Sequence, residues 1–89
     1  MAGGGDAGKM SATDTSPFAP PVKRSVTIAG HQTAISLEPI FWEALRDHAA
    51  KEGLPINALI ARIDAARLSA SAPPNLASAI RCWLFEEKI

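Results

Sequence analysis

The sequence lacks the features that mark secreted, membrane-bound and disulfide-stabilised proteins. It holds a single cysteine, Cys82, so no internal disulfide can form, and we expect a reducing, cytoplasmic location. No run of apolar residues is long enough to cross a bilayer, and the N-terminal segment has no long apolar stretch of the kind that a secretory signal needs. We therefore expect no membrane partner.

The sequence also lacks an excess of positive charge. Nine basic and nine acidic residues give a formal net charge of zero, which argues mildly against nucleic-acid binding because such proteins usually carry a basic balance. The distribution of the charges weakens this objection. From Val22 to Leu37 the only charged residues are Lys23 and Arg24, and the acidic residues that follow begin at Glu38.

Large apolar residues are scarce at the N-terminus. Residues 1–21 are rich in Gly, Ala, Ser, Thr and Pro, and besides the methionines Phe18 is their only large apolar side chain. Because such a segment cannot bury enough surface to offset its ordering entropy, we expect a disordered tail. Residues 22–89 remain for one folded domain, which is marginal in size for a monomer. The chain is nonetheless 47% apolar. Obligate dimerisation would resolve the mismatch between this apolar content and the small size of the domain.

Motifs for catalysis and metal binding are missing from the sequence. His31, His48 and Cys82 lie in three separate segments, without the spacing of a zinc site and with only three ligands among them. The serine, histidine and aspartate residues follow no known nucleophile pattern, and so short a chain leaves little room for a shielded pocket. We therefore expect no cofactor, no metal and no enzymatic activity.

The most informative segment is residues 22–45, in which a strand-like pattern leads into a helix. Residues 32–37 alternate between two sets: Thr33, Ile35 and Leu37 against Gln32, Ala34 and Ser36. A period of two predicts a strand with one face in water. Because a lone strand leaves its backbone groups unpaired, we expect it to pair with a second copy. Two such strands would form a ribbon of the size that enters a DNA major groove.

Residues 23–30 leave two interpretations open. Val26 and Ile28 alternate with hydroxyl residues, which predicts a second strand that turns at Gly30–His31 to form a hairpin within the chain. The alternative is an extended arm that lies over the helices. A hairpin would widen the sheet beyond two strands, and this could obstruct insertion into the groove unless the outer strand folds away.

Three helices are predicted after the strand: one over about 39–52, one that starts within 54–57 and continues to about 67, and one from 76 to about 87. Gly53 is expected to end the first helix in a left-handed conformation, and Asn75 to cap the third. Apolar residues at helical spacing predict the buried faces: Phe41, Trp42, Leu45 and Ala49, then Leu59, Ile60 and Ile63, then Leu76, Ile80, Trp83 and Leu84. We expect the first two faces to pack together and the third helix to close over them.

The order of strand, helix, glycine turn and second helix resembles the ribbon-helix-helix transcription factors, which include the Arc and methionine repressors. The resemblance covers roughly Lys23 to Arg67, and residues 23–87 look like a subgroup of small ribbon-helix-helix proteins common in alphaproteobacteria. The supporting motifs are TAISL at 33–37, EPIFW at 38–42 and GLPINALI at 53–60. The resemblance implies a mainly α fold with a short β ribbon, formed as an intertwined homodimer, with an additional C-terminal helix.

The same resemblance implies which residues meet the bases of DNA. The outward strand residues Gln32, Ala34 and Ser36 would face base edges in the major groove. A glutamine can pair with adenine through two hydrogen bonds, a serine can serve several bases, and an alanine can touch a thymine methyl group.

Other residues would meet the phosphates. Ile56 and Asn57 would lie at the N-terminus of the second helix, whose free amides would point at a phosphate group. Lys23 and Arg24 would supply most of the electrostatic affinity, since the ribbon residues themselves are uncharged.

Two classes of function follow from these observations. The first is a sequence-specific DNA-binding transcription regulator that inserts a dimeric β ribbon into the major groove. The second is a dimeric protein-interaction module, antitoxin-like or adaptor-like, with weak or no DNA binding and a protein partner at the C-terminal helix. Because phosphate contacts release counterions, DNA affinity that falls steeply with salt distinguishes the first class from the second.

Overall fold

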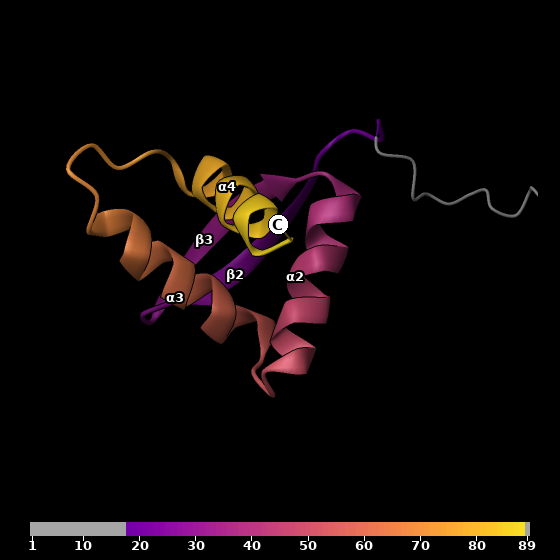
Figure 1. Cartoon of the computed structure of the whole chain (residues 1–89), viewed down its shortest axis with the longest axis horizontal. Helices are drawn as coiled ribbons and strands as arrows, with labels where there is room; N and C mark the ends of the chain where they lie inside the picture. Colours follow the sequence, from indigo (N-terminus) through magenta and orange to yellow (C-terminus); the bar gives the residue numbers. More distant parts are fainter. Residues whose placement is uncertain (1–17, 89) are drawn as a thin grey trace, which may run out of the picture.

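The computed structural model describes residues 18–88, so residues 1–17 of the expected disordered tail lie outside it. Two strands come first and three helices follow (Figure 1). The elements are β2 (Val22–Ile28), β3 (His31–Leu37), α2 (Pro39–Lys51), α3 (Ile56–Leu68) and α4 (Leu76–Lys88). The three predicted helices are confirmed, with ends within one residue of those expected.

The two strands form an antiparallel hairpin within the chain, which confirms the second strand and rules out the extended arm. Val22 lies opposite Leu37 and Ile28 lies opposite His31, so each strand is paired along its whole length. The strand of residues 32–37 is therefore not alone, and the argument that it needs a second copy as its partner is wrong. Homodimerisation itself stays a prediction, because the structure describes a single chain.

The hairpin turns at Ala29 and Gly30, one residue earlier than the expected Gly30–His31. Both residues have positive φ, 51° for Ala29 and 82° for Gly30. Two central residues of this kind form a type I′ turn, whose twist matches that of the strands it joins. Glycine adopts this conformation freely, whereas an alanine is strained in it.

The connection between α2 and α3 is built as the sequence predicts. Gly53 has a φ of 68°, in the left-handed region. The N–H of Gly53 donates to the carbonyl of Ala50 over 3.1 Å, and that of Leu54 donates to the carbonyl of Ala49 over 2.8 Å. This pair of bonds is a Schellman motif, which satisfies the last carbonyls of a helix and redirects the chain. Gly53 is thus confirmed as the cap that ends α2.

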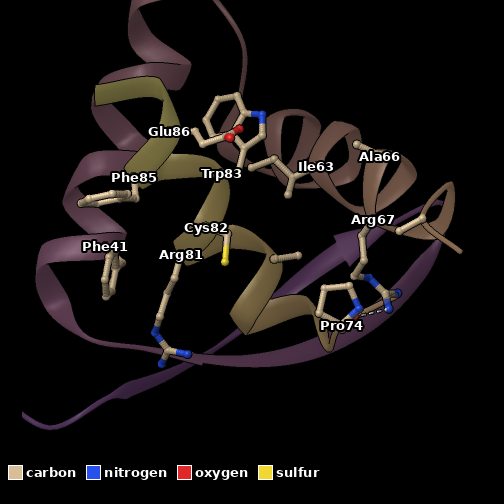
Figure 2. A pocket seen from close by; sticks show the side chains of 12 residues that line it. Phe41, Ile63, Ala66, Arg67, Pro74, Arg81, Cys82, Trp83, Phe85 and Glu86 are labelled. Atoms are coloured by element: carbon tan, nitrogen blue, oxygen red, sulfur yellow. Dashed lines mark hydrogen bonds between the residues drawn. The ribbon is translucent and has the colours of Figure 1, made fainter. Parts of the chain in front are cut away.

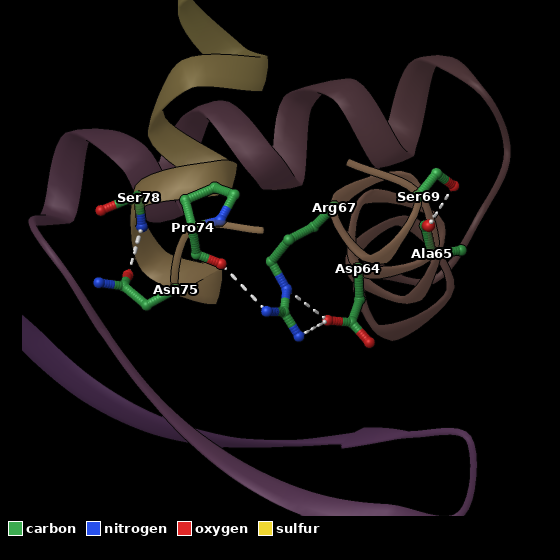
Figure 3. Close-up of polar contacts among 7 residues, drawn as sticks. All are labelled: Asp64, Ala65, Arg67, Ser69, Pro74, Asn75 and Ser78. Carbon is green, nitrogen blue, oxygen red and sulfur yellow. Dashed lines mark hydrogen bonds and ion pairs between the residues drawn. The ribbon is translucent and has the colours of Figure 1, made fainter. Parts of the chain in front are cut away.

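The other helix ends also follow local chemistry. Pro39 stands in the first turn of α2, where its missing N–H costs nothing. Asn75 caps α4 by accepting a 2.9 Å hydrogen bond at its Oδ1 from the N–H of Ser78 (Figure 3). The predicted N-cap is therefore confirmed, and it satisfies one of the amides that every helix leaves unpaired at its start.

The helices cover one face of the hairpin, and the core lies between these two layers (Figure 1). The inward strand residues join the apolar faces of all three helices in one buried cluster: Val26, Ile28, Ile35, Leu37, Trp42, Leu45, Ala49, Leu59, Ile60, Ile63, Ile80 and Leu84. The predicted packing of the helix faces into a common core is confirmed. Phe41, Leu76 and Trp83 were also predicted to be buried, but they are only half-buried and pack against the margin of this core. The ring centroid of Trp83 lies 5.0 Å from that of His48.

Two kinds of feature are absent from residues 18–88. No helix in this range has both the length and the apolar character of a membrane span. No group of three or more His, Cys, Asp or Glu side chains in the same range is placed to hold a metal ion.

Candidate nucleic-acid interface

One face of the hairpin points away from the helices and is exposed along its length. Its six residues form three cross-strand pairs: Lys23 with Ser36, Ser25 with Ala34, and Thr27 with Gln32. All six are exposed, because successive strand residues point to opposite faces and the alternate set packs toward the helices. We refer to these six residues as the ribbon face. A two-stranded antiparallel ribbon is narrow enough for the major groove of DNA.

The ribbon face carries hydrogen-bonding groups and almost no charge. Gln32 offers a donor and an acceptor side by side, and three hydroxyl groups can each donate or accept. Ala34 leaves a small apolar spot among them. Lys23 is the only charged residue of the face. Such a surface can make specific hydrogen bonds without presenting a strong field of either sign.

Sequence reasoning found part of this face and missed the rest. It named Lys23, Gln32, Ala34 and Ser36, all of which the structure places on the ribbon face. It did not name the hydroxyl residues of β2 as contacts, because the pairing of residues 23–30 was still open. The period-two alternation of that segment was a usable signal, and the register of the hairpin shows that its hydroxyl residues point outward.

Arg24 lies on the opposite side of β2 from Lys23. Its guanidinium carbon is 5.6 Å from the centroid of the Trp42 ring, a distance at which cation–π attraction acts. Arg24 also lines a hollow of about 430 Å³ beside β2, which we call the basic hollow; its lining is Arg24, Ser25, Val26, Trp42, Arg46, Ile56 and Asn57. The structure thus separates Lys23 from Arg24 and brings Arg24 together with Ile56 and Asn57.

The N-terminus of α3 opens onto the basic hollow. The N–H groups of Ala58 and Leu59 donate to the carbonyl of Pro55, and no side chain caps the start of the helix. The first turn of α3 contains no acidic residue. The positive end of the helix dipole therefore meets the hollow beside Ile56 and Asn57, an arrangement that favours an anion.

Arg46 is a residue of the basic hollow that sequence reasoning missed. It follows Trp42 by four residues, so both side chains lie on the same side of α2. Arg46 is exposed, and within residues 18–88 it forms no ion pair, whereas Arg62, Arg67 and Arg81 each pair with a carboxylate. The helical spacing from Trp42 was a usable signal once Arg24 was known to lie over that ring.

Carboxylates are kept away from both surfaces. Neither the ribbon face nor the lining of the basic hollow includes an aspartate or a glutamate. Glu38 follows β3 directly, but its carboxylate accepts hydrogen bonds from Arg81 of α4, at 3.1 Å from Nε and 3.0 Å from Nη2. Hydrogen bonds from its own backbone amide and from Arg81 hold the pKa of Glu38 below its ordinary value. The one carboxylate at the end of the ribbon is thus turned to the helices.

The start of α4 lies beside β3, the strand on the opposite edge of the hairpin from the basic hollow. A hollow of about 240 Å³ there is lined by residues 33–36 of β3 and by residues 75–77. The first turn of α4 consequently stands beside the strand that a second copy would have to pair with to form a shared ribbon.

Comparison with known protein families gives a match over most of the chain. A family model described as ribbon-helix-helix domain matches residues 21–87, which include both strands, α2, α3 and nearly all of α4. Searches of curated proteins and of solved structures gave no significant match. The matched range contains the whole ribbon face and the whole basic hollow.

Proposed function

Because the chain belongs to the ribbon-helix-helix domain family, we propose that it is a sequence-specific DNA-binding transcription regulator whose β2–β3 hairpin enters the major groove. The observation that carries this proposal is the ribbon face, a two-stranded surface of hydrogen-bonding side chains that is exposed and free of carboxylates. Such a surface can exchange hydrogen bonds with base edges without repelling the phosphates on either side.

Base reading would rest on the middle and the ends of the ribbon face. The amide of Gln32 matches the N6 and N7 positions of an adenine, and the hydroxyl of Ser36 can serve several bases. Ala34, between them on β3, fits against a thymine methyl group. The hydroxyls of Ser25 and Thr27 add contacts from β2, opposite Ala34 and Gln32 respectively.

Phosphate binding would rest on Lys23 and on the basic hollow. A ribbon lying in the groove has a phosphate strand along each edge, and the hollow borders the β2 edge through Ser25. Arg24, Arg46 and the first amides of α3 could then share one phosphate group. Charge-assisted hydrogen bonds of this kind position a protein on the duplex and carry most of its salt-dependent affinity.

Each chain would read DNA with its own hairpin. Pairing β3 with its counterpart in a second copy would give four strands spanning about 14 Å, from three spacings of about 4.8 Å, whereas the major groove is about 12 Å wide. The start of α4 also stands beside that strand. We therefore propose a homodimer in which each subunit reads DNA with its own hairpin. The two subunits do not share one ribbon.

A protein-interaction module is the second candidate function. The observation in its favour is that Lys23 is the only cation on the ribbon face of a chain whose formal net charge is zero. So little positive charge predicts weak DNA binding at physiological salt unless the basic hollow contributes.

The proposal is tested by selecting bound sequences from a random DNA pool with the full-length protein. We expect enrichment of a defined motif, and an affinity for that motif that falls linearly with the logarithm of the salt concentration. Absence of both enrichment and salt-dependent binding would favour the interaction module.

A charge-matched pair of variants sharpens this test. Lys23→Ala should flatten the salt dependence by roughly one unit of slope if Lys23 contacts a phosphate. Lys51→Ala removes the same charge from the end of α2, outside the ribbon face and the basic hollow, and should leave the slope near that of the wild type.

A further inference from the structure

Glu38 stands where the pattern of the ribbon face would continue along the chain. The ribbon-face residues of β3 are Gln32, Ala34 and Ser36, and position 38 is the next in this period of two. Glu38 still has an extended backbone, with φ −60° and ψ 149°, before α2 begins. A carboxylate at this position could extend the ribbon face with a negative charge, which would repel the phosphates of DNA.

Arg81 of α4 binds this carboxylate. Its Nε and Nη2 lie 3.1 Å and 3.0 Å from one carboxylate oxygen, Oε1 of Glu38. The guanidinium is held at the same time by Phe41, since its central carbon is 5.6 Å from the centroid of that ring. Arg81 extends from α4 beside Phe41 of α2 (Figure 2). Two contacts therefore fix the cation that holds Glu38.

Lys23 is the cation of the ribbon face that Glu38 could otherwise reach. Lys23 lies opposite Ser36, so Glu38, two residues further on, is its diagonal neighbour across the hairpin. Diagonal neighbours of this kind have Cα atoms about 7–8 Å apart, within reach of long side chains. Lys23 forms no ion pair within residues 18–88, whereas the adjacent Arg24 lies over Trp42. A Glu38 side chain without Arg81 would therefore find its partner in Lys23.

We propose that Arg81 is a positioning residue for DNA binding, because its hold on Glu38 leaves Lys23 free to contact a phosphate. This inference rests on the proposed function. Without Arg81, Glu38 pairs with Lys23 across the ribbon, and the phosphate has to compete with that ion pair. A protein that neutralises one phosphate fewer releases fewer counterions on binding. A residue of α4 thus sets the charge that the hairpin presents to DNA.

The first test measures the affinity of the full-length protein for a DNA duplex of mixed sequence across a range of salt concentrations. A mixed sequence suffices because phosphate contacts do not depend on the bases. Arg81→Gln should flatten the salt dependence by roughly one unit of slope, as the loss of one phosphate contact does. Glu38→Gln combined with Arg81→Gln should restore the slope of the wild type, since no carboxylate is left to pair with Lys23. A merely structural role of the ion pair would give no such recovery.

Two further variants control this test. Arg67→Gln removes the same charge and breaks the pair of Arg67 with Asp64, and neither residue belongs to the ribbon face or the basic hollow (Figure 3). Its salt slope should match that of the wild type. Arg81→Met should flatten the slope as Arg81→Gln does, and its unbranched apolar side chain can keep the packing against Phe41. Circular dichroism shows whether each variant keeps the helical content of the wild type.

The second test needs no DNA and follows the titration of the Glu38 carboxyl group by NMR. In Arg81→Gln, the further change Lys23→Ala should raise the pKa of Glu38, because it removes the new partner of the carboxylate. In the wild-type background, Lys23→Ala should leave the pKa of Glu38 where it is.

The outcomes separate this inference from the proposed function. A wild type that binds DNA with the same salt slope as Arg81→Gln overturns the inference and leaves the proposed function standing. A wild type that binds no DNA overturns the proposed function and, with it, this role of Arg81. A Glu38 titration in Arg81→Gln that is indifferent to Lys23→Ala overturns the inference whether or not DNA is bound.

Discussion

The guanidinium of Arg24 lies over the indole ring of Trp42, with its central carbon 5.6 Å from the ring centroid. The indole Nε1 in turn donates a 2.9 Å hydrogen bond to the carbonyl of Val22 at the start of the same strand. These two contacts tie β2 to α2. They also fix Arg24 on the inner side of the strand, so that Lys23 and Arg24 play different parts although they are adjacent in sequence.

Removing each of these two cations should change the free energy of unfolding by a different amount. Arg24→Ala should lower the free energy of unfolding by about 0.5–1 kcal/mol, because it removes a cation–π contact at an exposed site. Lys23→Ala should change it by less than about 0.5 kcal/mol, as expected for a surface residue that forms no ion pair within residues 18–88. Urea denaturation followed by tryptophan fluorescence measures both. A larger loss from Lys23→Ala than from Arg24→Ala would show that the assigned faces of β2 are reversed.

Leu45 tests the core. Its side chain is fully buried among the helices, so Leu45→Ala should cost about 2–5 kcal/mol of unfolding free energy through lost burial and the cavity left behind. Glu43→Ala changes an exposed residue of the same helix and should stay within about 0.5 kcal/mol of the wild type. Similar values for the two variants would contradict the inward face assigned to α2.

The hairpin turn predicts two changes of opposite sign. Gly30→Ala should destabilise the fold by about 1–2 kcal/mol, because an alanine is strained at a φ of 82° although no atom lies within 4 Å of the added carbon. Ala29→Asn should stabilise it by up to about 1 kcal/mol, since asparagine tolerates positive φ and suits the first position of a type I′ turn. Thermal unfolding measures both, and a melting temperature that rises in Gly30→Ala would rule out this turn.

Much of this architecture is encoded in local sequence. The period-two pattern of residues 32–37, the glycine after α2 and the asparagine before α4 each have one dominant structural meaning. They were predicted for that reason, and the structure confirms them. The apolar faces of the helices could be predicted in the same way, because helical spacing alone identifies which residues lie on the same side of a helix.

The remaining features depend on contacts that local sequence does not specify. A short alternating segment such as residues 22–28 pairs or stays free according to what lies beside it, so the hairpin could not be separated from an arm. The placement of Arg24 and Arg46 around one hollow required the register of the hairpin and the docking of α2. Whether the six residues of the ribbon face and the basic hollow meet DNA remains a prediction.

The ion pair of Glu38 with Arg81 predicts a pH dependence of stability. The folded-state pKa of Glu38 is lowered, mainly by its own backbone amide and by Arg81, so its stabilising effect is present above the unfolded-state pKa of about 4.5. That effect is lost as the pH falls through the folded-state value. Glu38→Gln should therefore melt below the wild type at neutral pH, and the difference should shrink toward zero in acid.

Thermal unfolding at neutral pH and at about pH 3 measures this difference. Glu43→Gln is the control, since Glu43 is exposed on α2, the helix that begins directly after Glu38, and forms no ion pair within residues 18–88. A gap between Glu38→Gln and the wild type that persists unchanged in acid would show that the carboxylate charge is not its source.

The ribbon face is proposed to read the base sequence of DNA, and Gln32 is the residue on which this reading depends most. The most direct test is the affinity of Gln32→Ala for the selected DNA motif and for DNA altered at each base pair of that motif, measured across a range of salt concentrations. We expect Gln32→Ala to lose about 1–3 kcal/mol of discrimination at one base pair per hairpin, with an unchanged salt slope because the side chain is uncharged. A preference that is intact at every base pair, in Gln32→Ala and in Ser36→Ala alike, would contradict it.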